Sequence, residues 1–121
     1  MLNKTTDQKR AAKPAANQLI QKTVATARLL DAYGVLLPEK QKKYLTYFYE
    51  EDFSLAEIGE KFLVSRQAVH DAIRHGEAQL QDYEATLHLV AKDISRQKTA
   101  DQLKQLTGNK SSINELIDKL L

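Results

Sequence analysis

Apolar residues between positions 54 and 73 follow the spacing of two short helices joined by a tight turn. In the first segment they recur at intervals of three and four residues, which places them on one helix face: Leu55, Ile58 and Phe62. The second segment repeats the pattern with an inward-facing set of Val69, Ala72 and Ile73. This stretch therefore predicts a helix-turn-helix, a unit that presents its second helix to a partner.

Residues at the helix ends support this assignment. Ser54 and Glu57 have the spacing of a capping box, in which each side chain accepts a hydrogen bond from the backbone N–H of the other residue. Ser65 is a cap candidate for the second helix. Leu63 occupies the turn position where glycine is usual, because the backbone there tends to a positive φ. We therefore expect the turn to carry strain on the order of 1 kcal/mol.

The outward face of the second helix carries polar side chains that can reach a nucleic acid. Arg66 and Gln67 lie at the helix N-terminus, where recognition helices contact base edges or phosphates. The same face continues toward the C-terminus with His70, Asp71 and Arg74. The candidate nucleic-acid contacts in this segment are Arg66, Gln67, His70 and Arg74. An ordinary solvated helix face is the alternative that the pattern leaves open.

The charge of this segment argues against tight binding to duplex DNA. From Ser54 to Leu80, three Lys or Arg residues stand against four Asp or Glu residues, a net charge of −1 at neutral pH. Independent duplex binders neutralise several phosphates and gain most of their non-specific affinity in this way. Weak binding, recognition of RNA shape and a protein partner are the alternatives that this charge leaves open.

Basic charge is concentrated in residues 1–17 instead. Four basic residues stand there against Asp7 alone, a net charge of +3, whereas the whole chain carries +2. The segment contains Pro14 and no large apolar residues beyond the first two, so we expect a disordered basic arm. Its candidate phosphate contacts, which would add salt-sensitive affinity, are Lys9, Arg10 and Lys13. The alternative is an ordinary solvated terminus.

Two further helices are predicted before the helix-turn-helix. Asn17 is a cap candidate for a helix that runs to about Leu36, with an inward face of Leu19 or Ile20, Val24, Ala27, Leu30 and Tyr33. Pro38 fits the first turn of the next helix, which has a buried stripe of Tyr44, Leu45 and Phe48. The aromatic residues between 44 and 53 could form a base-stacking platform, but their helical spacing favours core packing.

A heptad pattern begins inside the second helix of the motif. Steps of four and three residues connect Val69, Ile73, Gly76, Leu80, Tyr83, Leu87, Val90 and Ile94. The part beyond the motif predicts a seam for a homodimer, or for docking of the first helix, at Leu80, Tyr83, Leu87, Val90 and Ile94. Gly76 marks either a bend, which would make the heptad count a coincidence, or a close helix crossing.

The pattern is weaker after Gln97. A helix with Leu103 and Leu106 is predicted to end at Gly108 and Asn109. Ser112 and Glu115 have capping-box spacing at the start of a last amphipathic segment, with apolar positions Ile113, Leu116, Ile117, Leu120 and Leu121. This segment either packs on the body of the protein or binds a partner.

Length and composition set the outer limits. A chain of 121 residues with 42% hydrophobic content, four Gly and two Pro suits one small, nearly all-helical domain. We divide it into the arm at 1–17, a helix-turn-helix domain with a long helix at 18–97, and a C-terminal helical extension at 98–121. No cysteine is present and no apolar run is long enough for a membrane span, so we expect a cytoplasmic protein.

Catalytic chemistry finds no support in the sequence. The three histidines, His70, His75 and His88, have no Glu or second His at metal-ligand spacing. No glycine-rich phosphate loop and no serine in a nucleophile motif occur. We therefore expect a protein that is not an enzyme and that uses neither a cofactor nor a metal.

Three segments of the chain are characteristic: LLPEKQ at 36–41, SLAEI at 54–58 and VSRQAV at 64–69. With these segments at their intervals, residues 19–97 resemble the YlxM family of small bacterial helix-turn-helix proteins. The family is itself similar to the C-terminal helix-turn-helix region of sigma factors, known as region 4. The arm and the residues after Gln97 exceed the extent that the resemblance covers.

The resemblance implies a cytoplasmic accessory or regulatory protein connected with the signal recognition particle, with the RNA or the GTPase of that particle as partners. The sigma-type base contacts would fall on Arg66, Gln67, His70 and Asp71. Asp71 departs from the sigma pattern and repels phosphate, which argues against promoter DNA.

Together these observations predict an all-α protein with a sigma region 4-like helix-turn-helix, a core of three to four helices and a long C-terminal helical extension. Its expected function is non-catalytic docking to nucleic acid, with structured RNA favoured over duplex DNA. Two alternatives stay open. One is a dimeric DNA-binding transcription regulator, and the other is a protein-interaction module that uses the helix-turn-helix as a scaffold.

Overall fold

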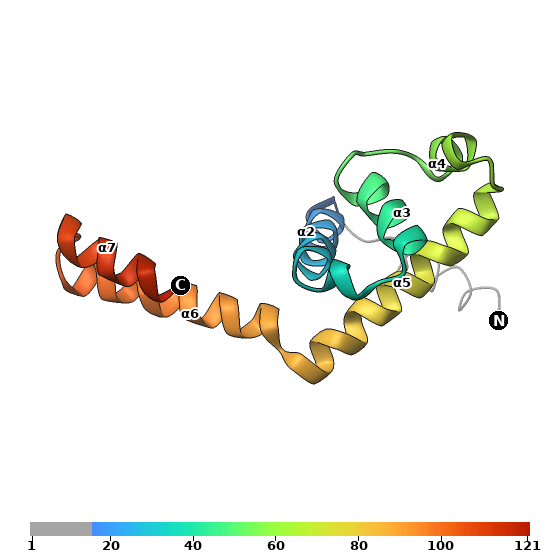
Figure 1. The fold of residues 1–121 in the computed structure, drawn as a ribbon. Helices are drawn as coiled ribbons and strands as arrows, with labels where there is room; N and C mark the ends of the chain where they lie inside the picture. The colour runs from blue at the N-terminus through green and yellow to red at the C-terminus, as the bar shows by residue number, and fades with distance from the viewer. Residues whose placement is uncertain (1–15) are drawn as a thin grey trace, which may run out of the picture.

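The computed structural model describes residues 16–121, which form α-helices and one short 3₁₀ turn. In chain order the elements are α2 (Ala16–Tyr33), η1 (Gly34–Leu36), α3 (Glu39–Tyr49), α4 (Leu55–Phe62), α5 (Arg66–Leu87), α6 (Leu89–Leu106) and α7 (Ser111–Leu120) (Figure 1). No strand occurs in the described part of the chain. The all-α prediction is therefore confirmed.

The long helix α5 organises the body of the protein. Helices α2, α3 and α4 all pack against it, and α2 and α3 also contact each other. Beyond the end of α5 the chain turns, and α6 and α7 form a hairpin that projects away from the body (Figure 1). The protein is thus elongated, with a helix-turn-helix body at one end and a two-helix hairpin at the other.

The core lies where α2, α3 and α4 meet α5. Its fully buried side chains come from all four helices: Tyr33, Leu45, Ile58, Val69 and Leu80. The aromatic residues Tyr47, Phe48 and Phe53 are half-buried and pack against this core, as their helical spacing predicted. Tyr47 lies with its ring centroid 4.9 Å from that of Phe53 and 5.5 Å from that of Phe62.

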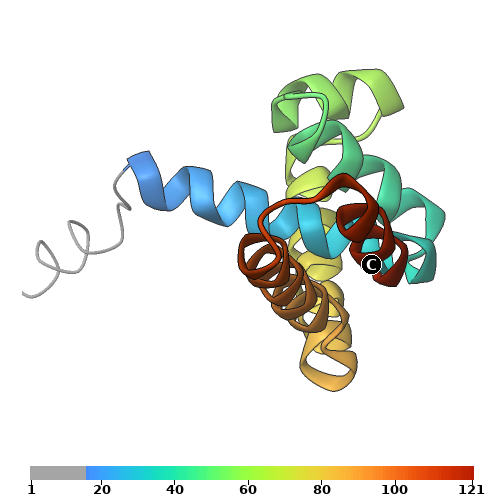
Figure 2. The same ribbon diagram turned by 90° about the vertical axis from the view of Figure 1, so that its left-hand side faces the viewer.

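The inward face predicted for the first helix is correct only in the C-terminal half of α2. Leu30 and Tyr33 are buried, but Leu19, Ile20 and Val24 are 52%, 64% and 46% exposed. Figure 2 shows the reason, because the N-terminal half of α2 extends past the helices that it packs against. The predicted cap residue Asn17 lies inside α2, whose described part already includes Ala16.

The helix-turn-helix forms as predicted. The Ser54 N–H donates to Glu57 Oε1 at 2.9 Å and the Glu57 N–H donates to Ser54 Oγ at 3.1 Å, which completes the capping box of α4. The Ala68 N–H donates to Ser65 Oγ at 3.0 Å at the start of α5. Leu63 has a φ of 58° and a ψ of 44°, so the expected left-handed turn is present without glycine.

Gly76 permits a close helix crossing and does not bend α5. A Cβ at this position would lie 2.7 Å from Leu45 Cδ1, so α3 approaches α5 more closely than a side chain would allow. The helix continues through Gly76 from Arg66 to Leu87. Of the two explanations offered for this glycine, the structure supports the close crossing.

The heptad seam does not lie on one continuous helix, which corrects the sequence prediction. Helix α5 ends at Leu87, His88 adopts a left-handed conformation with a φ of 56°, and α6 begins at Leu89. Leu80 is buried, and Tyr83 and Val90 are half-buried against the core. These three side chains therefore already have packing partners within the chain. Leu87 and Ile94 stay 42% and 36% exposed. Helix α2 contacts both α5 and α6, as the docking alternative proposed.

The bend between α5 and α6 is held by a hydrogen-bond network around Glu84, which we call the elbow (residues 84–91). The hydroxyl of Tyr33 donates to Glu84 Oε1 at 2.5 Å and accepts a hydrogen bond from the Leu89 N–H at 3.0 Å. The two carboxylate oxygens of Glu84 also accept from the N–H groups of Val90 and Ala91, each at 3.0 Å. These bonds satisfy free donors at the start of α6.

The network changes the pKa values of both side chains. The hydrogen bond from Tyr33, supported by those from the backbone, holds the pKa of the Glu84 carboxyl below its usual value. Burial, together with the hydrogen bond to Glu84, raises the pKa of the Tyr33 hydroxyl. The carboxylate is therefore stabilised in its charged form and the tyrosine in its neutral form.

Helix α7 folds back along α6 instead of packing on the body. Gly108 and Asn109 have φ values of 72° and 57° and make the turn, as predicted. The side chains of Lys104 and Asp118 form an ion pair at 2.7 Å across the hairpin. The capping box expected at Ser112 is wrong, because α7 begins at Ser111, after an N-cap at Lys110 that makes no side-chain cap bond.

Candidate nucleic-acid interface

The predicted contact residues share the outward face of the N-terminal half of α5. Helix α4 packs against this part of α5, and the cap at Ser65 fixes the direction in which α5 begins. Arg66, Gln67 and Arg74 are exposed, and the His70 side chain is 41% exposed. Arg66, His70 and Arg74 are four residues apart, so they follow one another along the same side of the helix. The structure thus brings the four residues together on one surface, which we call the α5 face.

Asp71 lies in the middle of the α5 face and engages two of the candidate contacts. Gln67 Nε2 donates to Asp71 Oδ1 at 2.9 Å, and His70 Nδ1 lies 3.2 Å from the same oxygen. These hydrogen bonds, that of His70 first, hold the pKa of the Asp71 carboxyl below its usual value. At neutral pH the α5 face therefore contains a negatively charged carboxylate, which repels a phosphate group.

The two arginines flank this carboxylate. Among the described residues, neither Arg66 nor Arg74 forms an ion pair with an acidic side chain. Eight residues of α-helix separate them by roughly 12 Å along the axis. Their guanidinium groups are therefore available for bidentate contacts to phosphate or to a guanine edge.

Lys22 is a basic neighbour that the sequence did not reveal. It lines a groove of about 410 Å³ between α2 and α5 together with Arg74, Thr26 and Glu77. The hydroxyl of Tyr49 donates a hydrogen bond to Glu77, and burial, together with this hydrogen bond, raises the pKa of Tyr49. Because Lys22 and Arg74 are 52 positions apart, only the packing of α2 on α5 places them side by side.

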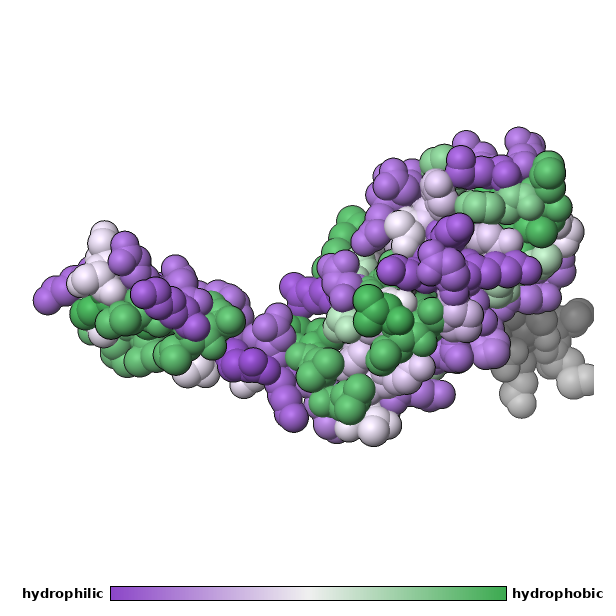
Figure 3. Space-filling view, viewed as in Figure 1, coloured by the Kyte–Doolittle hydropathy of each residue, from purple (hydrophilic) through white to green (hydrophobic). Residues whose placement is uncertain are grey.

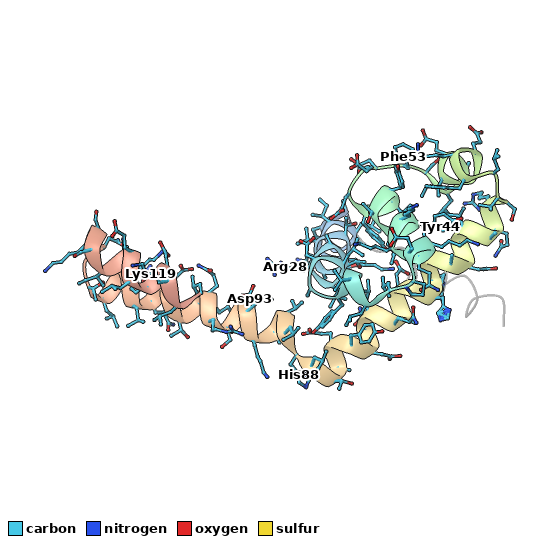
Figure 4. All side chains as sticks on the ribbon, in the orientation of Figure 1. Arg28, Tyr44, Phe53, His88, Asp93 and Lys119 are labelled. Carbon is cyan, nitrogen blue, oxygen red and sulfur yellow. The ribbon has the colours of Figure 1, made fainter. Side chains whose placement is uncertain are left out.

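A larger groove of about 580 Å³ separates α2 from α6 and contains none of the predicted contacts on α5. Figure 4 labels Arg28 on α2 and Asp93 on α6, which line it from opposite sides. Its lining also includes Asp31, Arg96 and Lys98, so its charge is mixed. An electrostatic preference for a polyanion does not arise from this lining.

The net charge differs between the two ends of the molecule. Residues 18–88, which include the helix-turn-helix, carry eight basic and eleven acidic side chains, a net charge of −3. Residues 89–121 carry six basic and four acidic side chains, a net charge of +2. The predicted contacts Lys9, Arg10 and Lys13 lie outside the described residues. The body therefore offers local contacts at the α5 face but no broad positive field.

Residues 16–121 show neither a cluster of metal-binding side chains nor a helix that could cross a membrane. No group of three or more His, Cys, Asp or Glu side chains there is arranged to hold a metal ion. None of the helices in this range is both long enough and apolar enough to span a membrane.

Comparison with known families assigns the chain. A family model for UPF0122, described as a helix-turn-helix protein that is YlxM/p13-like, matches residues 20–120. The chain belongs to the UPF0122 family. Its match extends past Gln97 to the end of α7, so the family pattern includes the whole hairpin and exceeds the segment that carries the resemblance in the sequence. The family description names a helix-turn-helix protein and no enzyme activity.

Individual relatives agree with the family assignment. The UPF0122 protein of Halalkalibacterium halodurans is 44% identical over 99 residues, which are 82% of this chain and 91% of that protein. A UPF0122 protein of Bacillus licheniformis is 44% identical over 101 residues, 84% of this chain and 94% of its own. A Bacillus cereus relative is 43% identical over 97 residues, which are 80% of this chain and 88% of that protein. The chain thus matches nearly the full length of these relatives.

Proposed function

We propose that this protein is a non-catalytic, cytoplasmic accessory factor of the signal recognition particle pathway that binds structured RNA through the α5 face. Arg66, Gln67, His70 and Arg74 make the contacts, and Lys22 adds a further cation beside Arg74. Lys9, Arg10 and Lys13 in the N-terminal arm supply additional salt-dependent affinity.

The observation that carries the proposal is the exposure of Arg66 and Arg74 on a capped recognition helix. A helix-turn-helix places the N-terminal residues of its second helix at the surface that meets a groove or a phosphate backbone. Two arginines without an acidic partner among the described residues suit that position. The family assignment to helix-turn-helix proteins supports the same use of α5.

Structured RNA is preferred over duplex DNA for electrostatic reasons. A duplex binder gains affinity from many phosphate contacts, whereas residues 18–88 carry a net charge of −3. Asp71 would also meet the phosphates of a regular major groove. A folded RNA exposes unpaired bases and an irregular backbone, so a few arginine and glutamine contacts can suffice.

The connection with the signal recognition particle rests on the resemblance to the YlxM family. The RNA of the particle is a structured RNA of the kind that the α5 face suits, and its GTPase is a second candidate partner. A GTPase partner would use the same face or the hairpin as a protein-binding surface.

Equilibrium binding to two nucleic acids tests the proposal. The full chain is titrated against a bacterial signal recognition particle RNA and a random DNA duplex of equal length, over a series of salt concentrations. We expect preferential binding to the RNA, and we expect Arg66→Ala to weaken it by about tenfold. Arg28→Ala, which removes an exposed arginine on α2, is the matched control and leaves binding unchanged.

Other outcomes reject the proposal in distinct ways. Binding to neither nucleic acid would favour a protein-interaction module, and the GTPase would be the next partner to test. Selective binding to one duplex sequence in the presence of competitor DNA would favour a transcription regulator. Equal losses for Arg66→Ala and Arg28→Ala would show that the α5 face is not the contact site.

A further inference from the structure

One side of the α6–α7 hairpin is apolar and uncovered. We call it the hairpin face and define it by Leu103, Leu106, Ile113, Leu116, Leu120 and Leu121. Leu106, Leu116 and Leu120 are 84%, 63% and 74% exposed, and Leu103 and Leu121 are 40% and 47% exposed. Figure 3 shows apolar side chains gathered along the hairpin, next to polar ones.

The residues of the hairpin face point the same way because of their spacing. Leu103 and Leu106 are three residues apart on α6, and Leu116 and Leu120 are four apart on α7, so each pair shares one helix face. Leu103, Leu120 and Leu121 line a common groove of about 210 Å³. Lys104 and Asp118, which form an ion pair, are two residues away from Leu106 and Leu116, so they lie on nearly opposite sides of their helices from these leucines.

The hairpin does not cover this face itself. Two helices enclose little between them, and only Ala100 and Ile117 are buried there. The body cannot cover it either, because the hairpin projects away from α2–α5 (Figure 1). In residues 1–15 the large apolar residues are Met1 and Leu2 alone, which is too little to cover six positions.

We propose that the hairpin face binds the same face of a second copy of this chain, forming a four-helix bundle. Two hairpins related by a two-fold axis place the leucine rows of one copy against those of the other, an isologous contact. In such a bundle α6 and α7 each pack against a helix of the second copy as well as against each other.

The exposed area is sufficient for a dimer. At about 32 Å² per aliphatic carbon, the exposed fractions of the five leucines correspond to about 400 Å² of apolar surface. Because interface surfaces are about 60% apolar, this corresponds to about 650 Å² per copy and 1,300 Å² in total. Stable interfaces bury about 1,200 to 2,000 Å². An apolar patch of this size is comparable to the largest patches on monomeric proteins, which are often interaction sites.

The charges around the hairpin face suit a second copy better than a polyanion or a lipid surface. Six basic and four acidic side chains are interspersed along residues 89–121, and no more than two charges of one sign follow each other. Lys104 and Asp118 already neutralise each other within one copy. Two copies can therefore approach without strong repulsion, and the rim can form ion pairs of both orientations.

The oligomeric state of the full chain tests this proposal, independently of nucleic-acid binding. In sedimentation velocity we expect a species of twice the 13.7 kDa chain mass at micromolar concentration. Leu106→Glu places a charge at the most exposed leucine of the hairpin face and should weaken dimerisation by at least about tenfold. Leu116→Glu, on the other helix, should have the same effect.

A matched control tests whether loss of the dimer is specific to the hairpin face or follows from replacing any exposed apolar residue. Val35→Glu, at a position that is 78% exposed in η1, should leave the dimer unchanged. Far-ultraviolet circular dichroism checks that each variant keeps its helix content. A wild-type monomer at about 100 µM, or a dimer that persists in both leucine variants, overturns the proposal. We expect Arg66→Ala to stay dimeric whether or not it loses RNA binding. Failure of the proposed RNA binding can therefore be distinguished from failure of the proposed dimer.

Discussion

The hydroxyl of Tyr33, at the end of α2, donates a 2.5 Å hydrogen bond to the carboxylate of Glu84, near the end of α5. The two residues are 51 positions apart in the sequence. Their contact, with the backbone donors that follow Glu84, makes the elbow part of the body instead of a free linker. The direction of the hairpin therefore depends on a side chain from the first described helix.

Removing the Tyr33 hydroxyl should destabilise the protein. Tyr33→Phe loses the donor to Glu84 and the acceptor for the Leu89 N–H inside a buried site. We expect the melting temperature to fall by about 5 °C. Tyr83→Phe is the control, because its hydroxyl lies 3.5 Å from the Leu36 carbonyl oxygen, a weak contact. Thermal unfolding followed by circular dichroism compares the two, and equal losses would contradict our description of the elbow.

The low pKa of Glu84 predicts a loss of stability in acid. The folded-state pKa lies below the ordinary value of 4.5, so the stabilisation is present above that value and is lost as the pH falls through the folded-state pKa. We expect Glu84→Gln to reduce the difference in unfolding free energy between pH 7 and pH 4. Urea unfolding at the two pH values measures this. Glu60→Gln, an exposed carboxylate on α4, should keep the wild-type difference, and an unchanged difference in Glu84→Gln would refute the prediction.

Leu63 offers a stabilising substitution in the turn of the helix-turn-helix. Its side chain is 91% exposed and its φ is 58°, so it contributes little burial while the backbone is strained. We expect Leu63→Gly to raise the free energy of unfolding by about 0.5 to 1 kcal/mol. Ala78→Gly, at an exposed position within α5, should lower it by about 1 kcal/mol. A loss of stability in Leu63→Gly, measured by urea unfolding, would show that the turn is not strained.

Asp71 should limit nucleic-acid affinity on the α5 face. Asp71→Asn removes a negative charge between Arg66 and Arg74 while an amide oxygen can still accept from Gln67. We expect binding to the signal recognition particle RNA to tighten about three- to tenfold, with a larger gain for duplex DNA. Asp93→Asn changes the net charge equally but lies on α6, so it should have little effect. A weaker complex for Asp71→Asn would mean that the carboxylate positions the contact residues and that repulsion is minor.

The features that sequence analysis predicted correctly are mostly local. The capping box of Ser54 and Glu57, the cap at Ser65 and the left-handed Leu63 each depend on backbone groups within a few residues. The apolar spacing of α4 and α5 predicted the buried side chains for the same reason. The family resemblance, which rests on these segments, was also correct.

The features that sequence analysis missed depend on contacts between residues that are far apart in the sequence. The heptad count continued through His88 because no glycine or proline marks the break, and the contact that holds the elbow comes from Tyr33. Lys22 lies beside Arg74 of the α5 face only because α2 packs on α5. The exposed half of α2 has the same apolar spacing as a buried helix. This spacing does not show that the helices packed against α2 cover only its other half. The nucleic-acid contacts themselves stay a prediction.

Helix α5 carries functional candidates at both ends. Its first turn holds Arg66 and Gln67, and its last turns hold Glu84 and the elbow. An α-helix of 22 residues is roughly 33 Å long and stiff over that length. Helix α5 therefore sets the separation between its first turn and the elbow. Whatever binds the first turn of α5 is held at a set distance and orientation from whatever binds the hairpin.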